Sequence, residues 1–398
     1  MLQRPLIVVS LEGLSRSALG CYGCSWNRTP AIDAIAAGGT IWDRWIATRD
    51  DDRELFSTWF DPESSTSGNL RWLDSWRQRG PTHFLSDSPS WQSLAEAGFD
   101  SVRSVPRPGH QQPVGPDDVA ETQFGRLVAA AVDRDQQEEP WSVLWLHSNF
   151  LTSCWDAPRD LFPLDDIDAE IDEPQDPELA AWQESDDIET VERLPWTFDT
   201  VSPPEELLTE ESHPDLLTTW MRTYACQVRL VDLLLEVLLQ SLSVEDPWLV
   251  LLGTSGFHFG QDRWIGHRGR SLRSADIHLP LLISDSGPLR VPHLTSTDEL
   301  PELLGRLAET QPLALPQQWA RPTSLAQQDA SPDDQREMVC VETASHRAAW
   351  VTTTPQWFYL QEDSGEEHLF LKPDDVDDFN DVARVRPDVT SQLRERKK

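Results

Sequence analysis

Hydrophobic and polar positions divide the chain into short apolar runs and longer stretches with helical spacing. The short runs are rich in Val, Ile and Leu and end at turn residues, which is typical of strands buried within a sheet. They lie at residues 6–9, 82–86, 101–105, 141–147, 248–252 and 278–283. Apolar spacing and capping residues indicate helices at 30–37, 91–97, 120–132, 216–242 and 300–310. Strands alternating with helices predict an α/β sheet covered on both faces.

Three polar stretches interrupt this pattern. Residues 49–80 are predicted to be irregular, residues 160–215 are acidic and divided by prolines, and residues 284–337 are rich in Pro, Ser and Gln. We therefore divide the chain into three parts: an α/β core at 1–290 with an acidic insert at 160–215, a connecting segment at 291–337, and a C-terminal lobe at 338–398.

Composition narrows the classes of partner. The chain has 398 residues, enough for a full core, and 18 Trp to help fill it. Its formal charge is −35, from 68 acidic and 33 basic residues. Such a field repels nucleic acids and anionic membranes, so we expect neither as a partner. It also opposes a small anion unless arginines form a local positive patch.

Targeting features and cysteines suggest a compartment. The first apolar run lacks a small-residue cleavage site, so no secretory signal is expected. No run reaches the roughly 20 apolar residues of a membrane span. The five cysteines are scattered, at positions 21, 24, 154, 226 and 340, which is typical of reduced thiols. We expect a cytoplasmic protein.

The first predicted strand leads directly into Glu12 and a glycine-containing turn. Ligands of open α/β sheets sit at the carboxyl ends of strands, so this is where a site is expected. The chain continues with Leu19-Gly-Cys-Tyr-Gly23 and Thr29-Pro-Ala-Ile-Asp33. This stretch resembles the opening of the sulfatase family, in the alkaline phosphatase superfamily. In that family the first strand ends in a metal-binding Asp or Asp-Asp, whereas here Leu11-Glu12 stands in that place.

Three later blocks resemble the same family, in the same order, at residues 145–158, 224–283 and 357–383. The first contains Trp155-Asp-Ala-Pro158, the second contains Gly266-His-Arg268, and the third looks like the family's C-terminal hairpin. The resemblance implies a sulfatase-like central mixed sheet with helices on both faces, plus a small C-terminal α+β lobe.

The chemistry that the resemblance implies is incomplete in this chain. Sulfatases use a Cys or Ser converted to formylglycine together with a divalent cation, usually calcium, held by several carboxylates. In register with that motif, Arg53 matches the family's Arg, and the nucleophile position is Arg49, which cannot act as a nucleophile. After the late strand, Thr254-Ser255 runs directly into Gly256-Phe257, so the expected ligand Asp is missing.

Five candidate residues remain. Arg53 and His267 are candidates for contacting an anion, although Arg53 could instead pair with the acids at 50–52. Glu12, His258 and Asp262 are candidates for a rebuilt metal site.

Two functions follow from these candidates. The first is a catalytically impaired or inactive sulfatase homologue that binds a small anion, a protein partner or an active relative. The alternative is an active sulfuric or phosphoric ester hydrolase with a remodelled divalent-cation site, with Ser57 or Thr58 as nucleophile, acids at 50–52 as further ligands and His267 as acid.

Overall fold

A central sheet organises the protein. The computed structural model describes residues 4–60, 71–88, 91, 98–107, 116, 118–137, 139–163, 193–309, 338–343 and 350–396. Within these residues the sheet has nine strands, in the order β10-β2-β11-β7-β1-β5-β3-β4, with β12 also paired to β2. Their bounds are β1 Leu6–Leu11, β2 Thr40–Ile46, β3 Thr82–Ser86, β4 Ser101–Ser104, β5 Val143–Ser148, β7 Trp248–Gly253, β10 His278–Leu279, β11 Leu281–Ile283 and β12 Leu289–Ser296.

The sheet is mixed. Strands β7, β1, β5, β3 and β4 run parallel to one another, whereas β11 pairs antiparallel with both β7 and β2. The carboxyl ends of β7, β1, β5 and β3 therefore meet at one edge, where the sequence places Glu12.

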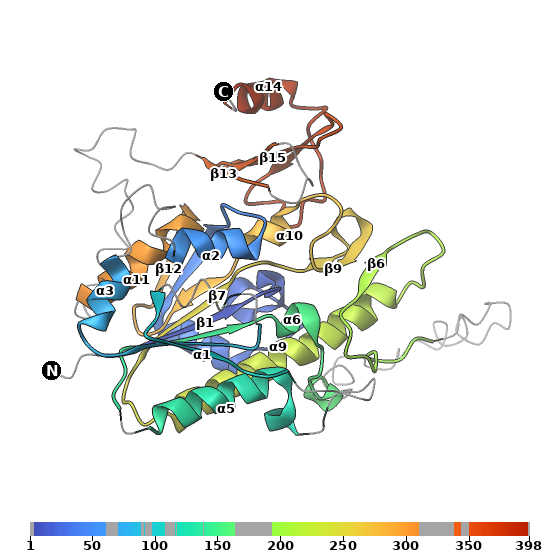
Figure 1. Cartoon of the computed structure of the whole chain (residues 1–398). Helices are drawn as coiled ribbons and strands as arrows, with labels where there is room; N and C mark the ends of the chain where they lie inside the picture. Colours follow the sequence, from blue (N-terminus) through green and yellow to red (C-terminus); the bar gives the residue numbers. More distant parts are fainter. Residues whose placement is uncertain are drawn as a thin grey trace.

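Helices cover both faces of the sheet (Figure 1). One face carries α1 Pro30–Gly38, α5 Gln123–Asp135 and α9 Leu216–Ser241, and the other carries α2 Asp52–Phe60, α3 Arg71–Arg77 and α11 Leu300–Glu309. Because strand side chains alternate between faces, Leu6 and Val8 of β1 join one core while Ile7 and Val9 join the other. The predicted fold class is confirmed.

Aromatic side chains fill the core beneath α2. Trp145 of β5 is fully buried and lies with its ring centroid 5.0 Å from that of Phe60 and 6.2 Å from that of Trp59. Phe84 and Phe99 close the same cluster. Large rings at these separations interact favourably beyond the area they bury.

Two predictions from the sequence are wrong, one about residues 49–80 and one about where the core ends. Residues 49–80 are not simply irregular, because they contain α2 and α3, and the Asp51 carboxylate caps α2 by accepting the N–H of Glu54 at 3.1 Å. The core does not end at residue 290, because β12 pairs with β2 and α11 packs on α3. Residues 310–337 of the connecting segment lie outside the described residues, as do 164–192 of the acidic insert and 92–97 of a predicted helix.

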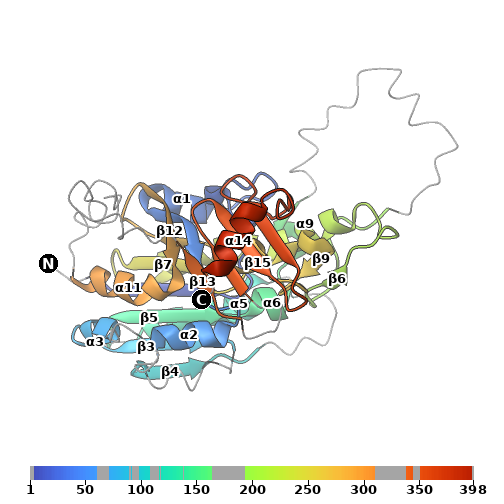
Figure 2. The same cartoon turned by 90° about the horizontal axis from the view of Figure 1, so that it is seen from above.

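The C-terminal lobe is an antiparallel sheet under one helix. Its elements are β13 Val339–Val341, β14 Trp350–Thr353, β15 Trp357–Gln361, β16 Glu367–Leu371 and α14 Pro387–Glu395. The lobe lies over the sheet on the side of α2 and of the short helix α10 Ser274–Ile277 (Figures 1 and 2). The four strands and the helix confirm the small C-terminal α+β lobe that the resemblance predicted.

Short elements complete the fold. A three-stranded sheet consists of β6 Glu205–Leu207, β8 His258–Phe259 and β9 Trp264–Gly266, and two short helices are α6 Phe150–Ser153 and α10 Ser274–Ile277. The 3-10 turns span Arg16–Ala18, Gly20–Tyr22, Val119–Glu121, Arg159–Leu161, Gln261–Arg263 and Thr297–Glu299. Among the helices of the described residues, none combines the length and apolarity needed to cross a bilayer.

Candidate active site

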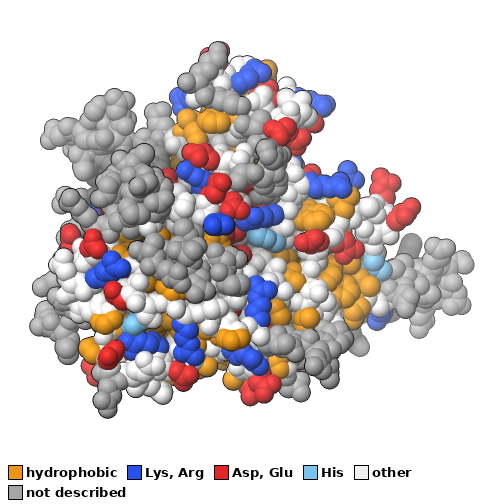
Figure 3. Space-filling view, in the orientation of Figure 1, with side chains coloured by type: hydrophobic (Ala, Val, Ile, Leu, Met, Phe, Trp, Pro, Cys, Tyr) orange, Lys and Arg blue, Asp and Glu red, His pale blue; other side chains and the backbone are white. Residues whose placement is uncertain are grey.

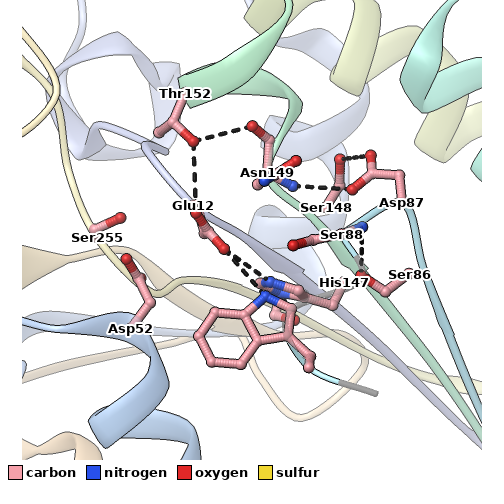
Figure 4. Close-up of polar contacts among 12 residues, drawn as sticks. Glu12, Asp52, Ser86, Asp87, Ser88, His147, Ser148, Asn149, Thr152 and Ser255 are labelled. Carbon is pink, nitrogen blue, oxygen red and sulfur yellow. Dashed lines mark hydrogen bonds and ion pairs between the residues drawn. The ribbon is translucent and has the colours of Figure 1, made fainter. Parts of the chain in front are cut away.

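Polar side chains gather where the central parallel strands end. Leu11, the last residue of β1, pairs with Ser148 of β5 on one side and with Gly253 of β7 on the other. The next residues, Glu12 and Thr254, therefore emerge side by side at the same edge. Figure 4 shows Glu12 at the centre of this group.

Glu12 is nearly fully buried and is held by two donors. Its Oε1 lies 3.2 Å from Nε2 of His147 and 3.2 Å from the indole nitrogen of Trp91. Its Oε2 has only a long contact, 3.5 Å, from the Thr152 hydroxyl. Burial raises the pKa of Glu12, and the charge of Asp52 raises it further, while His147 and Arg268 oppose that rise.

A hydrogen-bonded chain fixes the His147 ring from behind. Nδ1 of His147 lies 3.0 Å from the Ser10 hydroxyl, which in turn accepts the indole N–H of Trp145 at 2.8 Å. His147 has no exposed surface. Its position at the end of β5 therefore makes it a support for Glu12.

An ion pair between the buried Asp52 and the partly exposed Arg268 lies beside Glu12. Asp52, in the first turn of α2, accepts a hydrogen bond from Nη2 of Arg268 at 2.5 Å, and Nη1 of Arg268 reaches Asp51 at 3.4 Å. Asp52 is 4% exposed, and one of its oxygens, Oδ1, has no hydrogen-bond partner. Burial would lower the pKa of Arg268, but Asp52, Asp51 and Glu12 together raise it.

Ser255 and His267 form a second polar pair at this edge. The Ser255 hydroxyl lies 3.0 Å from Nε2 of His267 and accepts the backbone N–H of Gly13 at 3.1 Å. A serine next to an imidazole is the arrangement that activates a hydroxyl nucleophile. The sequence singled out His267 but not Ser255, because the two are joined only by the fold.

Asp87, which follows β3, is a further site residue that sequence reasoning missed. Its carboxylate accepts hydrogen bonds from the Ser148 hydroxyl at 2.5 Å, the Gln123 amide at 2.9 Å and the Asn149 N–H at 3.2 Å. Burial raises the pKa of Asp87, and these bonds oppose that rise. The available signal was its place directly after a predicted strand. Figure 4 shows it on the far side of His147 from Asp52.

The residues matched to the family's nucleophile motif do not face Glu12. Nη2 of Arg49 pairs with Glu342 of the C-terminal lobe at 3.2 Å. Arg53 is exposed on α2 and makes no ion pair within the described residues, since Asp51 and Asp52 pair with Arg268 instead. The structure therefore does not bring Arg53 into the site.

The two hydroxyls considered as nucleophiles also point elsewhere. Ser57 donates to the carbonyl of Glu54 and Thr58 to that of Leu55, each at 2.7 Å. Hydroxyls bonded one turn back along a helix serve the helix rather than a ligand.

The three candidate metal ligands are not brought together. Nε2 of His258 lies 3.0 Å from a carboxylate oxygen of Asp276, and the half-exposed Asp262 pairs with Arg273 at 3.7 Å. Within the described part of the chain, the one group of three possible ligands that converge is Glu362, Glu366 and His368, on the lobe's hairpin. Glu12 is not part of it.

The residues present do not fit the family's divalent cation. A calcium site needs six to eight oxygen ligands, and of the acids named here only Asp52 joins Glu12, already paired with a guanidinium. At Gly256, where the missing ligand would follow Ser255, an added Cβ would lie 1.7 Å from the backbone oxygen of Ala275. No side chain can occupy that position without moving the backbone.

The raised pKa of Glu12 predicts how stability depends on pH. A carboxyl with a higher pKa in the folded state binds more protons when folded, so its ionisation lowers stability as pH rises past the unfolded value, about 4.3. We expect Glu12→Gln, which keeps an oxygen for His147 and Trp91, to remove this loss. Urea unfolding at pH 4, 6 and 8 measures the free energy of unfolding of the wild type and of the variant.

Glu54→Gln, on the exposed surface of α2, is the control. The stability of the wild type relative to Glu12→Gln should fall from pH 4 to pH 8. A difference that stays constant with pH would contradict the prediction.

Comparisons with known proteins place the fold. No protein-family model matches the chain, and no curated protein matches it in sequence. Solved structures match it over 99% of its length. One is a sulfatase-family protein from Bacteroides thetaiotaomicron, with a TM-score of 0.66, 12% identity and 91% of that chain covered.

Two other solved structures match with similar scores. A phosphonate monoester hydrolase of Agrobacterium radiobacter matches with a TM-score of 0.63 at 15% identity, over 94% of its length. A protein solved with its substrate D-glucosamine-2-N,6-O-disulfate matches with a TM-score of 0.62 at 14% identity, over 97% of its length. Likeness at this identity extends to the fold and not to the activity. The chain therefore has the fold of these solved structures, a sulfatase and a phosphonate monoester hydrolase among them.

Proposed function

We propose that this protein is a non-hydrolytic sulfatase homologue that acts as a binding protein. The observation that carries the proposal is the start of α2, where the family's nucleophile is expected. Arg49 there pairs with the lobe, and Asp51 and Asp52 pair with Arg268. Neither a nucleophile nor a cation site of the family's kind is left at this position.

The same contacts argue against a small anion as the ligand, which leaves a protein partner as the ligand that we propose. Of the arginines in the loop around His267, Arg268 and Arg273 are already paired with acids. Basic side chains are scattered among acidic ones on the face that Figure 3 shows, rather than gathered into one patch. With a formal charge of −35, a sulfate or phosphate group finds little local attraction here.

A panel of ester substrates tests this proposal. Aryl sulfates, aryl phosphates and an aryl phosphonate monoester are incubated with the protein, with and without calcium, manganese or zinc. We expect no release of the phenol above the rate without protein. Metal-dependent turnover that Glu12→Gln abolishes would contradict the proposal.

The Ser255–His267 hydrogen bond favours one competing function. In it the protein hydrolyses esters without metal, with Ser255 as nucleophile, His267 as base and the Gly13 N–H positioned beside the hydroxyl. The same panel distinguishes it when Ser255→Ala is included. Turnover that needs no metal and disappears in Ser255→Ala would establish this alternative.

A further inference from the structure

Two buried carboxylates share the centre of the site. Glu12 is 9% exposed and Asp52 is 4% exposed, and Figure 4 shows the Glu12 carboxylate facing His147 and Thr152, with Asp52 on its other side near Ser255. Neighbouring carboxylates cannot both stay ionised in a buried site unless a cation compensates them. The family implied by the fold uses a divalent metal ion for this purpose, and the residues present do not fit one.

Arg268 supplies a positive charge at this place. Its guanidinium joins Asp52 through Nη2 and Asp51 through Nη1, so one side chain reaches both acids of the first turn of α2. Arg268 also acts on Glu12 electrostatically. Its backbone is in the left-handed region, with φ of 56°, which a residue other than glycine adopts only where its surroundings require it.

Three oxygen atoms at or near the carboxylates could bind a cation if Arg268 lost its positive charge. Oδ1 of Asp52 and the hydroxyl of Thr254 are buried without hydrogen-bond partners, and Oε2 of Glu12 has only its long contact with Thr152. Buried acceptors without partners are rare and costly in folded proteins.

We infer that the Arg268 guanidinium is the resident cation of this site, where it neutralises Asp52 beside Glu12 in place of a divalent metal ion. The inference rests on the proposed non-hydrolytic function, but it makes a separate claim. The wild-type site needs no metal, and the carboxylate pair becomes a metal site only when residue 268 loses its charge.

Thermal unfolding of the full chain tests the inference, after dialysis against a chelator and then with 5 mM calcium or manganese. We expect no cation response in the wild type. Arg268→Met should melt about 5–10 °C lower in chelator, because a buried carboxylate loses its partner, and should regain at least half of that loss with the cation. Arg268→Lys keeps the charge and should show no cation response.

A double variant, Asp52→Asn with Arg268→Met, is the matched control and should not respond to cations either. Because the hairpin group of Glu362, Glu366 and His368 is intact in every variant, a response confined to Arg268→Met reports the central site. If Arg268→Met does not fold in chelator, the yield of folded protein on refolding with and without cation gives the same answer.

Three results would overturn the inference: a wild type as cation-dependent as Arg268→Met, an Arg268→Met that gains nothing from cations, or an Arg268→Lys that gains as much. None of these readouts involves ester hydrolysis. Metal-free turnover through Ser255 would therefore defeat the proposed function and leave this inference standing.

Discussion

Replacing Gly256 with Ala is expected to destabilise the protein by about 3 kcal/mol or more. The added methyl carbon would lie 1.7 Å from the carbonyl oxygen of Ala275, and that oxygen belongs to the backbone just inside α10, so it cannot swing aside. The N–H of Gly256 also donates to the carbonyl of Asp276 at 3.3 Å, which holds the two segments together. Chemical denaturation followed by circular dichroism measures the loss.

Gly38→Ala is the matched control for this prediction. Gly38 ends α1, and a Cβ built there meets nothing within 4 Å. Its replacement should leave stability unchanged or raise it by up to about 1 kcal/mol, because alanine loses less backbone freedom on folding. If both variants lose the same stability, the close approach at Gly256 is not the cause.

The clash at Gly256 also bears on the missing metal ligand. Gly256→Asp would restore the residue type that the family resemblance leads one to expect, yet it meets the same oxygen as Gly256→Ala. We expect Gly256→Asp to be destabilised at least as much and to gain no metal affinity. A single substitution at Gly256 is therefore not expected to create a metal ligand, because the backbone of Ala275 occupies the place of the side chain.

Strong periodicity explains which elements the sequence could predict. The bounds of β3 agree with the prediction, and those of β1, β7 and α9 agree to within two residues, because their apolar runs match one period throughout. Strand β2 was missed because Asp43 and Arg44 interrupt its apolar residues. In the fold these two side chains reach Arg290 and the C-terminal lobe.

Helix α2 was missed for a related reason. Its start is crowded with acids that resemble a loop, although Leu55, Phe56, Trp59 and Phe60 have helical spacing and are all buried. Asp51 caps the helix locally, but the burial of Asp52 is explained by Arg268, more than 200 positions away in the chain. Sequence patterns report local structure, so a pair made by tertiary contact lies beyond them.

The same limit applies to the site as a whole. The end of β1 and the residue Glu12 could be predicted, because a strand that ends in a carboxylate marks a sheet edge. Asp52 was among the acids at 50–52 that the sequence offered as further ligands beside Glu12. The hydrogen-bond partners of Glu12, His147 and Trp91, could not be predicted, since they come from two other segments. His258 and Asp262 were placed in the site by sequence proximity alone, and each is paired elsewhere.

Trp145→Ala is expected to cost about 4 kcal/mol of stability, the range found for removing a large aromatic side chain from a core. Trp145 is fully buried at the centre of the aromatic cluster under α2 and donates to Ser10, which holds the ring of His147. The cavity should therefore loosen both the core and the support of Glu12. Denaturation followed by circular dichroism measures the stability, since 18 tryptophans make fluorescence ambiguous.

Two variants separate these effects. Trp145→Phe keeps most of the ring packing but removes the donor to Ser10, so it should cost about 1–2 kcal/mol. Trp26→Ala, on the opposite face of the sheet and only partly buried, should cost less than half as much as Trp145→Ala. If Trp26→Ala and Trp145→Ala lowered the free energy of unfolding equally, the cluster under α2 would contribute no more to stability than aromatic packing elsewhere. The predicted order would show that the aromatic cluster under α2, which also holds Ser10 behind the ring of His147, contributes more to stability than the aromatic packing on the opposite face.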